Sequence, residues 1–207
     1  MHNIKGSQLQ KPAITQVPID PLIAERWSGR AYDPTKPVSA EQQLALLEAA
    51  RWAPSCFGDQ PWRFVVWDKH ADPVNWQRAY DCLVPGNQSW AQHAGLLILA
   101  AADTLFTHNG KPNRWHGYDT GAAMENLCLQ ATSMGLMAHQ MGGFDGDMLR
   151  AEFGIPEQIS LMAMVSVGYP ADIATVTGEL LERETAPRTR RALGELFFAG
   201  SWGTPIV

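Results

Sequence analysis

Four runs of apolar residues along the chain predict the strands of a central sheet. Residues 64–67 are aromatic and β-branched, and residues 96–101 form a continuous apolar run that is typical of a buried strand. Residues 136–141 predict a short strand that ends before two glycines, and residues 161–167 predict a further buried strand. The segments between these runs have a helical period, so helices and strands are mixed along the chain.

The clearest helix start is Ser39, because Gln42 three residues later completes a capping box. The apolar positions of this helix are spaced by three or four residues. Its predicted buried stripe consists of Leu44, Leu47 and Ala50, with Leu46 and Ala49 broadening it.

Residues 117–134 are apolar on nearly all sides, which predicts a helix that is buried in the core or shared between subunits. Gly135 then stands where a helix commonly ends in a left-handed residue. Shorter helices are predicted over residues 21–27, 73–83, 87–93 and 145–153.

Both ends of the chain differ from this central part. Residues 1–20 read as a loose arm, whereas residues 21–207 form one predicted domain. From residue 169 onward the chain is predicted to be extended and polar, yet it carries apolar residues near its end, namely Leu196, Phe197, Phe198 and Trp202. Exposed apolar side chains of this kind are usually buried against another surface, so we expect a partner subunit.

Composition and charge narrow the function classes. The chain has 207 residues, of which 45% are hydrophobic and 18% charged, as in ordinary globular domains. A net charge of −5 offers no general attraction for nucleic acid or an anionic membrane, and the apolar runs are too short to span a bilayer. The three cysteines have no metal-ligand spacing, which is consistent with a reducing cytoplasm and predicts no metal.

The loop AARWAPSCFGDQPWRF, residues 49–64, joins a helix directly to a strand. Pro54 and Pro61 restrict its entry and exit, and Gly58 allows positive φ and close approach of another group. Such a loop brings backbone groups to an edge where a ligand can bind. An ordinary helix-to-strand connection is the alternative.

Two arginine clusters stand far apart in the sequence: Arg26 and Arg30 flank Ser28, and Arg188 lies two residues before Arg190. Guanidinium groups on one side of an extended segment can hold a phosphate in forked fashion. A mononucleotide phosphate in so acidic a protein would need both clusters, although solvated surface patches are the alternative. No GxGxxG or Walker A sequence is present, and Ser55 and Cys56 lack a neighbouring histidine for nucleophilic catalysis.

Several motifs, taken together and in order, resemble the FMN-dependent nitroreductase family. They are RWSGR at 26–30, EAARWAPS at 48–55, QPWRF at 60–64, residues 87–90 before the central strand, HQMGGFD at 139–145 and RTR at 188–190. The resemblance covers residues 22–202. It implies an α+β fold with a central mixed, mainly antiparallel sheet flanked by helices. It also implies an intertwined homodimer in which residues 170–207 wrap the partner.

The resemblance further implies FMN at the dimer interface and NAD(P)H as co-substrate. Hydride would pass through flavin N5 to a small organic acceptor (a nitroaromatic, a quinone or a flavin) by a ping-pong cycle, so no catalytic side chain need be present. Two alternatives remain: a flavin-binding protein without turnover, and a specialised reductase or dehalogenase of the same family. The specialised branches usually add a lid, and the candidate lid here, residues 104–116, is short.

Site residues carry over position by position. Arg26, Ser28 and Arg30 would contact the phosphate, the ribityl chain or the pyrimidine edge, and Arg188 and Arg190 would hold the phosphate. Asn87 would bond the pyrimidine side. Gly142 and Gly143 would offer backbone N–H groups near N5. The loop residues Pro54, Ser55, Cys56 and Gln60 would belong to the flavin wall supplied by the other subunit.

The chain departs from the family pattern at four positions. Gly58 stands where an asparagine is common, with Asp59 beside it. Cys56 replaces a frequent second serine, and Gly142 replaces a frequent glutamate. These are the positions at which flavin contacts or acceptor choice can differ from those of relatives.

Overall fold

The computed structural model describes residues 3–5 and 8–207. Its centre is a four-stranded sheet in the order β3-β4-β6-β5, and every neighbouring pair is antiparallel. The predicted α+β fold is confirmed, and the described strands pair without a parallel neighbour. The strands are β3 (Trp62–Asp68), β4 (Leu96–Asp103), β5 (Met137–Met141) and β6 (Ile159–Gly168).

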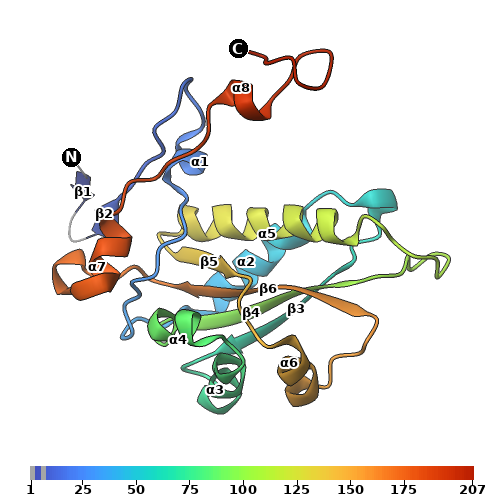
Figure 1. The fold of residues 1–207 in the computed structure, drawn as a ribbon. Helices are drawn as coiled ribbons and strands as arrows, with labels where there is room; N and C mark the ends of the chain where they lie inside the picture. Colours follow the sequence, from blue (N-terminus) through green and yellow to red (C-terminus); the bar gives the residue numbers. More distant parts are fainter. Residues whose placement is uncertain (1–2, 6–7) are drawn as a thin grey trace.

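Helices cover both faces of the sheet, as Figure 1 shows. On one face lie α2 (Ala40–Arg51) and the long α5 (His116–Ser133). On the other face lie α3 (Pro73–Asp81), α4 (Pro85–Ala91) and α6 (Gly146–Phe153). The helix predicted over 87–93 begins two residues earlier, because Pro85 suits the first helical position.

The central strand β4 is buried on both faces. Its odd-numbered residues, Leu97 and Leu99, pack with Trp90 in the core beside α3 and α4. Its even-numbered residues, Leu96 and Ile98, pack in a second core that includes residues of α2 and α5. Because successive strand residues point to opposite faces, a strand between two helical layers must be apolar throughout, which explains the continuous run.

The capping box of α2 is confirmed. Ser39 Oγ accepts from the Gln42 N–H at 3.2 Å, and the Gln42 side chain accepts from the Ser39 N–H at 3.1 Å. Leu46 and Ala50 are buried, but Leu44, which was expected in the stripe, is 69% exposed, so that expectation was wrong. Residues two positions apart in a helix differ in direction by about 200°, so Leu44 points away from the core when Leu46 faces it.

Helix α5 also ends as predicted. Gly135 has φ +71°, and its N–H bonds to the Thr132 carbonyl at 3.0 Å. The left-handed residue after the helix stops it without steric cost, because glycine has no Cβ.

The prediction of an extended chain after residue 169 was wrong over α7 (Gly178–Thr185). Glu179 pairs with Arg183 at 2.5 Å along one helix face, and Leu180 packs against the core. Such i, i+4 pairs support a helix, but in a segment this short the packing decides its formation. The 3-10 turn Ile173–Thr175 and the helix α8 (Leu193–Leu196) are further helical pieces of this tail.

The terminal segments run side by side away from the body of the molecule (Figure 1). The first comprises β1 (Asn3–Lys5), β2 (Gln8–Gln10) and the chain up to α1 (Pro21–Glu25). Within the N-terminal arm Lys11 is buried, and its Nζ donates to the Glu184 carbonyl at 2.5 Å, which attaches the arm to the rest of the chain at this residue. Among the described residues we find no helix with the length and hydrophobicity that a bilayer crossing requires.

Candidate cofactor site

Three of the predicted arginines line one groove. Arg26, Arg188 and Arg190 border a space of about 600 Å³ between residues 13–23 and 188–193. Burial, together with the positive charges of Arg26 and Arg190, lowers the pKa of Arg188. A carboxylate does reach the group, since Arg26 Nε lies 3.3 Å from Glu125 Oε1. The groove nevertheless holds excess positive charge, which is the environment that a phosphate needs.

Arg188 holds the backbone of this groove together. Its guanidinium donates to the carbonyls of Lys11 (2.5 Å), Ala24 (2.8 Å) and Arg26 (3.0 Å). Arg190 is exposed, and its Nη1 donates to the carbonyl of Thr189. Arg190 therefore has more free donors than Arg188 for an anion in the groove.

Buried polar groups fix the segment that carries Arg26, Ser28 and Arg30. The Glu184 carboxylate accepts from the backbone N–H of Arg30 at 2.8 Å, and burial raises its pKa. His139 Nδ1 lies 3.1 Å from the Gly29 carbonyl, to which its N–H donates. Burial, and secondly the charge of Arg30, lower the pKa of His139 to about 4, so its ring is neutral at pH 7.

Within this segment, the two side chains predicted to contact the cofactor beside Arg26 have different surroundings. Ser28 is exposed. The Arg30 guanidinium lies 5.7 Å from the centroid of the Trp90 ring on α4. Arg30 is thus directed toward the α4 side of the sheet.

Asn87 and the glycine pair meet at the end of β5. Asn87 Nδ2 donates to the Gly143 carbonyl at 2.9 Å, and the Val84 N–H donates to the same oxygen at 3.2 Å. A Cβ at Gly143 would lie 2.7 Å from Val84 Cγ2, whereas nothing lies within 4 Å of one at Gly142. Close packing of α4 requires glycine at 143, and the backbone at 142 faces open space.

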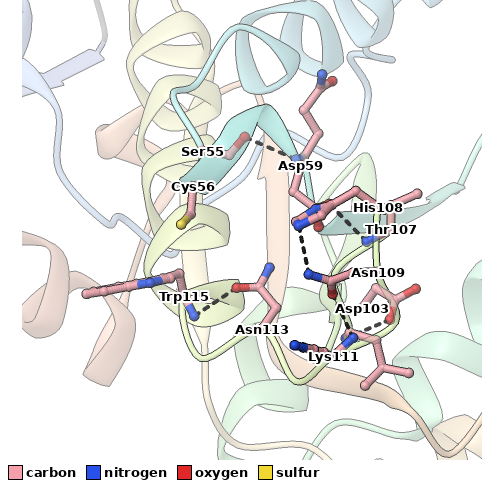
Figure 2. Close-up of polar contacts among 12 residues, drawn as sticks. Ser55, Cys56, Asp59, Asp103, Thr107, His108, Asn109, Lys111, Asn113 and Trp115 are labelled. Atoms are coloured by element: carbon pink, nitrogen blue, oxygen red, sulfur yellow. Dashed lines mark hydrogen bonds and ion pairs between the residues drawn. The ribbon is translucent and has the colours of Figure 1, made fainter.

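The loop after α2 forms the 3-10 turn η1 (Cys56–Gly58), shown in Figure 2. Ser55 Oγ accepts from the Gln60 N–H at 3.0 Å. The Cys56 N–H donates to Asp119 Oδ2 of α5 at 3.0 Å. Pro54 and Gln60 are exposed, while Ser55 and Cys56 are half-buried. The loop is thus a fixed turn tied to the first part of α5.

Comparison with known proteins decides the family. The model of the nitroreductase family matches residues 23–169 of this chain. The chain belongs to the nitroreductase family. The prediction made from the ordered motifs is therefore confirmed.

Individual relatives agree with this membership. A solved structure described as an oxidoreductase containing FMN is 36% identical, with a TM-score of 0.85 and coverage of 92% of this chain and 96% of its own. A proposed NAD(P)H nitroreductase of Haemophilus influenzae is 42% identical over 88% of this chain and 96% of its own length. A proposed NADH dehydrogenase/NAD(P)H nitroreductase of Archaeoglobus fulgidus is 30% identical over 73% and 84%.

In this member of the nitroreductase family the predicted site residues fall into separate groups. Across the described residues, no hydrogen bond or ion pair joins residues 54–60 to the arginine groove or to Gly142 and Gly143. In Figure 1 the η1 turn lies at the N-terminal end of α5, and the segments of Arg26 and Arg188 lie toward its other end. Within the part of one copy that the structure describes, the predicted site residues therefore do not form one connected site.

Sequence reasoning missed four residues that hold these groups in place. Asp119 gave a signal, because it is a lone acidic residue near the start of an apolar helix. His139 lies in the HQMGGFD motif, where the sequence gives no sign that its ring bonds the Gly29 backbone. Glu184 and Lys11 lie in polar segments in which no local pattern marks a buried charge.

Proposed function

We propose that this nitroreductase is an NAD(P)H-dependent oxidoreductase that binds FMN between the two copies of a homodimer. The observation that carries the proposal is the groove in which Arg26, Arg188 and Arg190 converge from distant parts of the chain. A relative with 36% identity contains FMN, whose phosphate is an anion of the kind that the groove suits.

The remaining residues fit the other parts of a flavin mononucleotide. Gly142 leaves its backbone open to a flat ring. Gly143 and Asn87 are held against each other, so Asn87 is positioned for the pyrimidine side. Pro54, Ser55, Cys56 and Gln60, which lie on the η1 loop of the same chain, would complete the wall of the partner's flavin. This assignment explains why one chain divides the site residues between the two ends of α5.

The bound flavin would supply the redox chemistry, taking hydride from NAD(P)H at N5 and passing it to a nitroaromatic, quinone or flavin in a ping-pong cycle. The chain's own residues would bind and orient the flavin and exclude water from it. The arginines hold the phosphate, and the half-buried hydrogen bonds of His139 and Glu184 keep the segment 26–30 in place.

The visible absorption spectrum of the purified protein tests this proposal. We expect a yellow protein that is bleached by NADH or NADPH without oxygen and regains its colour when a nitroaromatic or quinone is added. A colourless protein that cannot be reconstituted with FMN would contradict the proposal. Bound FMN that stays oxidised with either nucleotide would identify a flavin-binding protein without turnover instead.

Two arginine variants distinguish a loss of phosphate binding from a general loss of stability. Arg190→Ala should weaken FMN binding at least about tenfold, because a phosphate loses a charged donor. Arg183→Ala is the matched control, since Arg183 pairs with Glu179 on the surface of α7. Equal FMN affinity in the two variants would place the phosphate elsewhere.

A further inference from the structure

A second hollow lies beside the η1 turn, away from the arginine groove. It has a volume of about 430 Å³ and is lined by Phe57, Gly58, Asp59, Thr107 and His108. Thr107 and His108 belong to the hairpin of residues 104–115 between β4 and α5, which folds back through the Leu105–Pro112 bridge. Figure 2 shows this hairpin facing Asp59.

Phe57 presents an aromatic ring at this hollow. Its side chain is 83% exposed, and its φ of 57° lies in the left-handed region that phenylalanine rarely adopts. The ring makes edge contacts with Phe106 at 5.8 Å and with His108 at 5.6 Å. Such backbone strain persists only where the surroundings hold it, and it is concentrated at functional sites.

Asp59 places a buried negative charge under the same hollow. Its side chain is 3% exposed, and Oδ1 accepts from the Thr107 N–H at 2.9 Å. Oδ2 is buried and has no hydrogen-bond partner among the described residues. Nor does any described lysine or arginine form an ion pair with it; His108 Nδ1, at 3.8 Å, is the neighbouring basic group.

The Asp59 carboxylate has no lysine or arginine partner among the described residues, so its charge acts over a longer range than that of an ion-paired carboxylate. Asp103, at the base of the hairpin, offers the contrast, because Arg63 lies 3.9 Å from its carboxylate. Because the Asp59 carboxylate is buried, solvent screens it less than it screens a surface carboxylate, so its field extends into the hollow.

The hollow adjoins the residues that we place at the flavin. The Asp59 N–H donates to the Cys56 carbonyl at 3.1 Å, and the next residue bonds Ser55 Oγ. Asp59 therefore belongs to the same turn as the flavin wall. A role for the hollow in acceptor choice rests on the proposed function, since the acceptor must reach that flavin.

We propose that Phe57 and Asp59 select the electron acceptor: planar aromatic acceptors that are neutral or positively charged, over those carrying a carboxylate or sulfonate. The Phe57 ring supplies an apolar surface for a flat acceptor. The Asp59 charge attracts an ammonium group and repels an anion at the same place. Both residues lie in the part of the loop where this chain departs from the family pattern.

Three acceptors of similar shape and different charge test this selection: 4-nitrobenzylamine in its ammonium form, 4-nitrobenzyl alcohol and 4-nitrobenzoate. The measurement is kcat/KM of the FMN-loaded protein at pH 7.5 with saturating nucleotide. Asp59→Asn should raise the value for the benzoate and lower it for the ammonium compound, each about fivefold. The value for the neutral alcohol should stay within about twofold, because a field acts on charge.

Asp103→Asn is the matched control, since it removes a carboxylate that already has a cationic neighbour. His108→Lys adds a cation at a half-exposed position beside Asp59. It should change the kcat/KM values of the three acceptors in the same directions as Asp59→Asn. This second variant keeps the test valid if Asp59→Asn does not fold.

Equal changes for all three acceptors, or no change, would overturn the selection and leave Asp59 with a structural role. Such a result with active, FMN-loaded protein leaves the proposed function standing. A protein that binds no FMN, or whose FMN stays oxidised with NADH and NADPH, refutes the proposed function, and this inference falls with it. Bound FMN that is reduced by nucleotide but reduces none of the three acceptors overturns this inference alone.

Discussion

The imidazole of His139 lies between an aromatic ring and a backbone carbonyl. Its centroid is 4.6 Å from that of Trp90, and its Nδ1–H donates to Gly29. Burial and the nearby Arg30 keep the ring neutral, with a pKa of about 4. A single half-buried histidine thus links the central sheet to the segment of Arg26 and Arg30.

This environment predicts a pH dependence of stability. Because the folded-state pKa lies below the unfolded value of about 6.5, the unfolded chain binds a proton between those values that the folded chain does not. Stability is therefore lost as pH falls from 6.5 toward 4, by about 2 to 3 kcal/mol at pH 4.5. Urea unfolding at pH 7.0 and 4.5 measures this loss.

His139→Gln should show a smaller loss over the same interval. Glu184, whose raised pKa gives a contribution of opposite sign, is present in both proteins and cancels in the comparison. Equal losses in the two proteins would show that His139 does not titrate in this way.

At the scale of elements, α5 organises the site from one side. Its first turns hold the η1 loop through Asp119, and Glu125 further along pairs with Arg26. Asp119 is 3% exposed, so its carboxylate is held in a restricted place in the packed structure. The helix therefore sets the distance between the loop and the arginine groove.

Removing the Asp119 acceptor should loosen the loop. Asp119→Ala leaves the Cys56 N–H without its partner, which costs about 1 to 3 kcal/mol. We expect faster hydrogen exchange at the Cys56 amide and lower stability, with partial rescue in Asp119→Asn. Asp147→Ala, a change at an exposed position in the first turn of α6, is the control. Unchanged exchange at Cys56 in Asp119→Ala would argue against this role.

At the scale of the whole molecule, the two terminal segments carry apolar residues that the single chain does not cover. Ile14 is 93% exposed, Phe197 54% and Trp202 92%. Together they lie on segments that extend from the body in Figure 1. Exposed apolar surface of this extent is typical of an interface, and a second copy of the chain is the partner that we propose.

Phe197→Asp should weaken that association. Light scattering should give about twice the chain mass of 22.8 kDa for the unmodified protein and a lower mass for the variant at micromolar concentration. Bound flavin should be lost together with the dimer, because the loop of each copy would complete the other's site. Val74→Asp, at a 69% exposed position on α3, is the control. A Phe197→Asp protein that remains dimeric would contradict this interface.

Local sequence determined much of the fold. The apolar run of β4, the Ser39 capping box and the left-handed Gly135 are each set by residues a few positions apart. Backbone geometry and side-chain period act at that range, which is why these elements were predictable. The ordered motifs likewise identified the family from sequence, although family membership and not local physics connects them to a flavin.

Tertiary structure alone decided the long-range contacts of the site and the burial of its charged residues. The bonds of Arg188 reach Lys11, 177 residues away, and the burial of Asp59 depends on a hairpin 48 residues later. The helix at Gly178–Thr185 and the exposure of Leu44 likewise follow from which surfaces meet. Periodicity along a chain reports neighbours in sequence. The hydrogen-bond partners of a charged side chain and its burial depend instead on packing between distant segments.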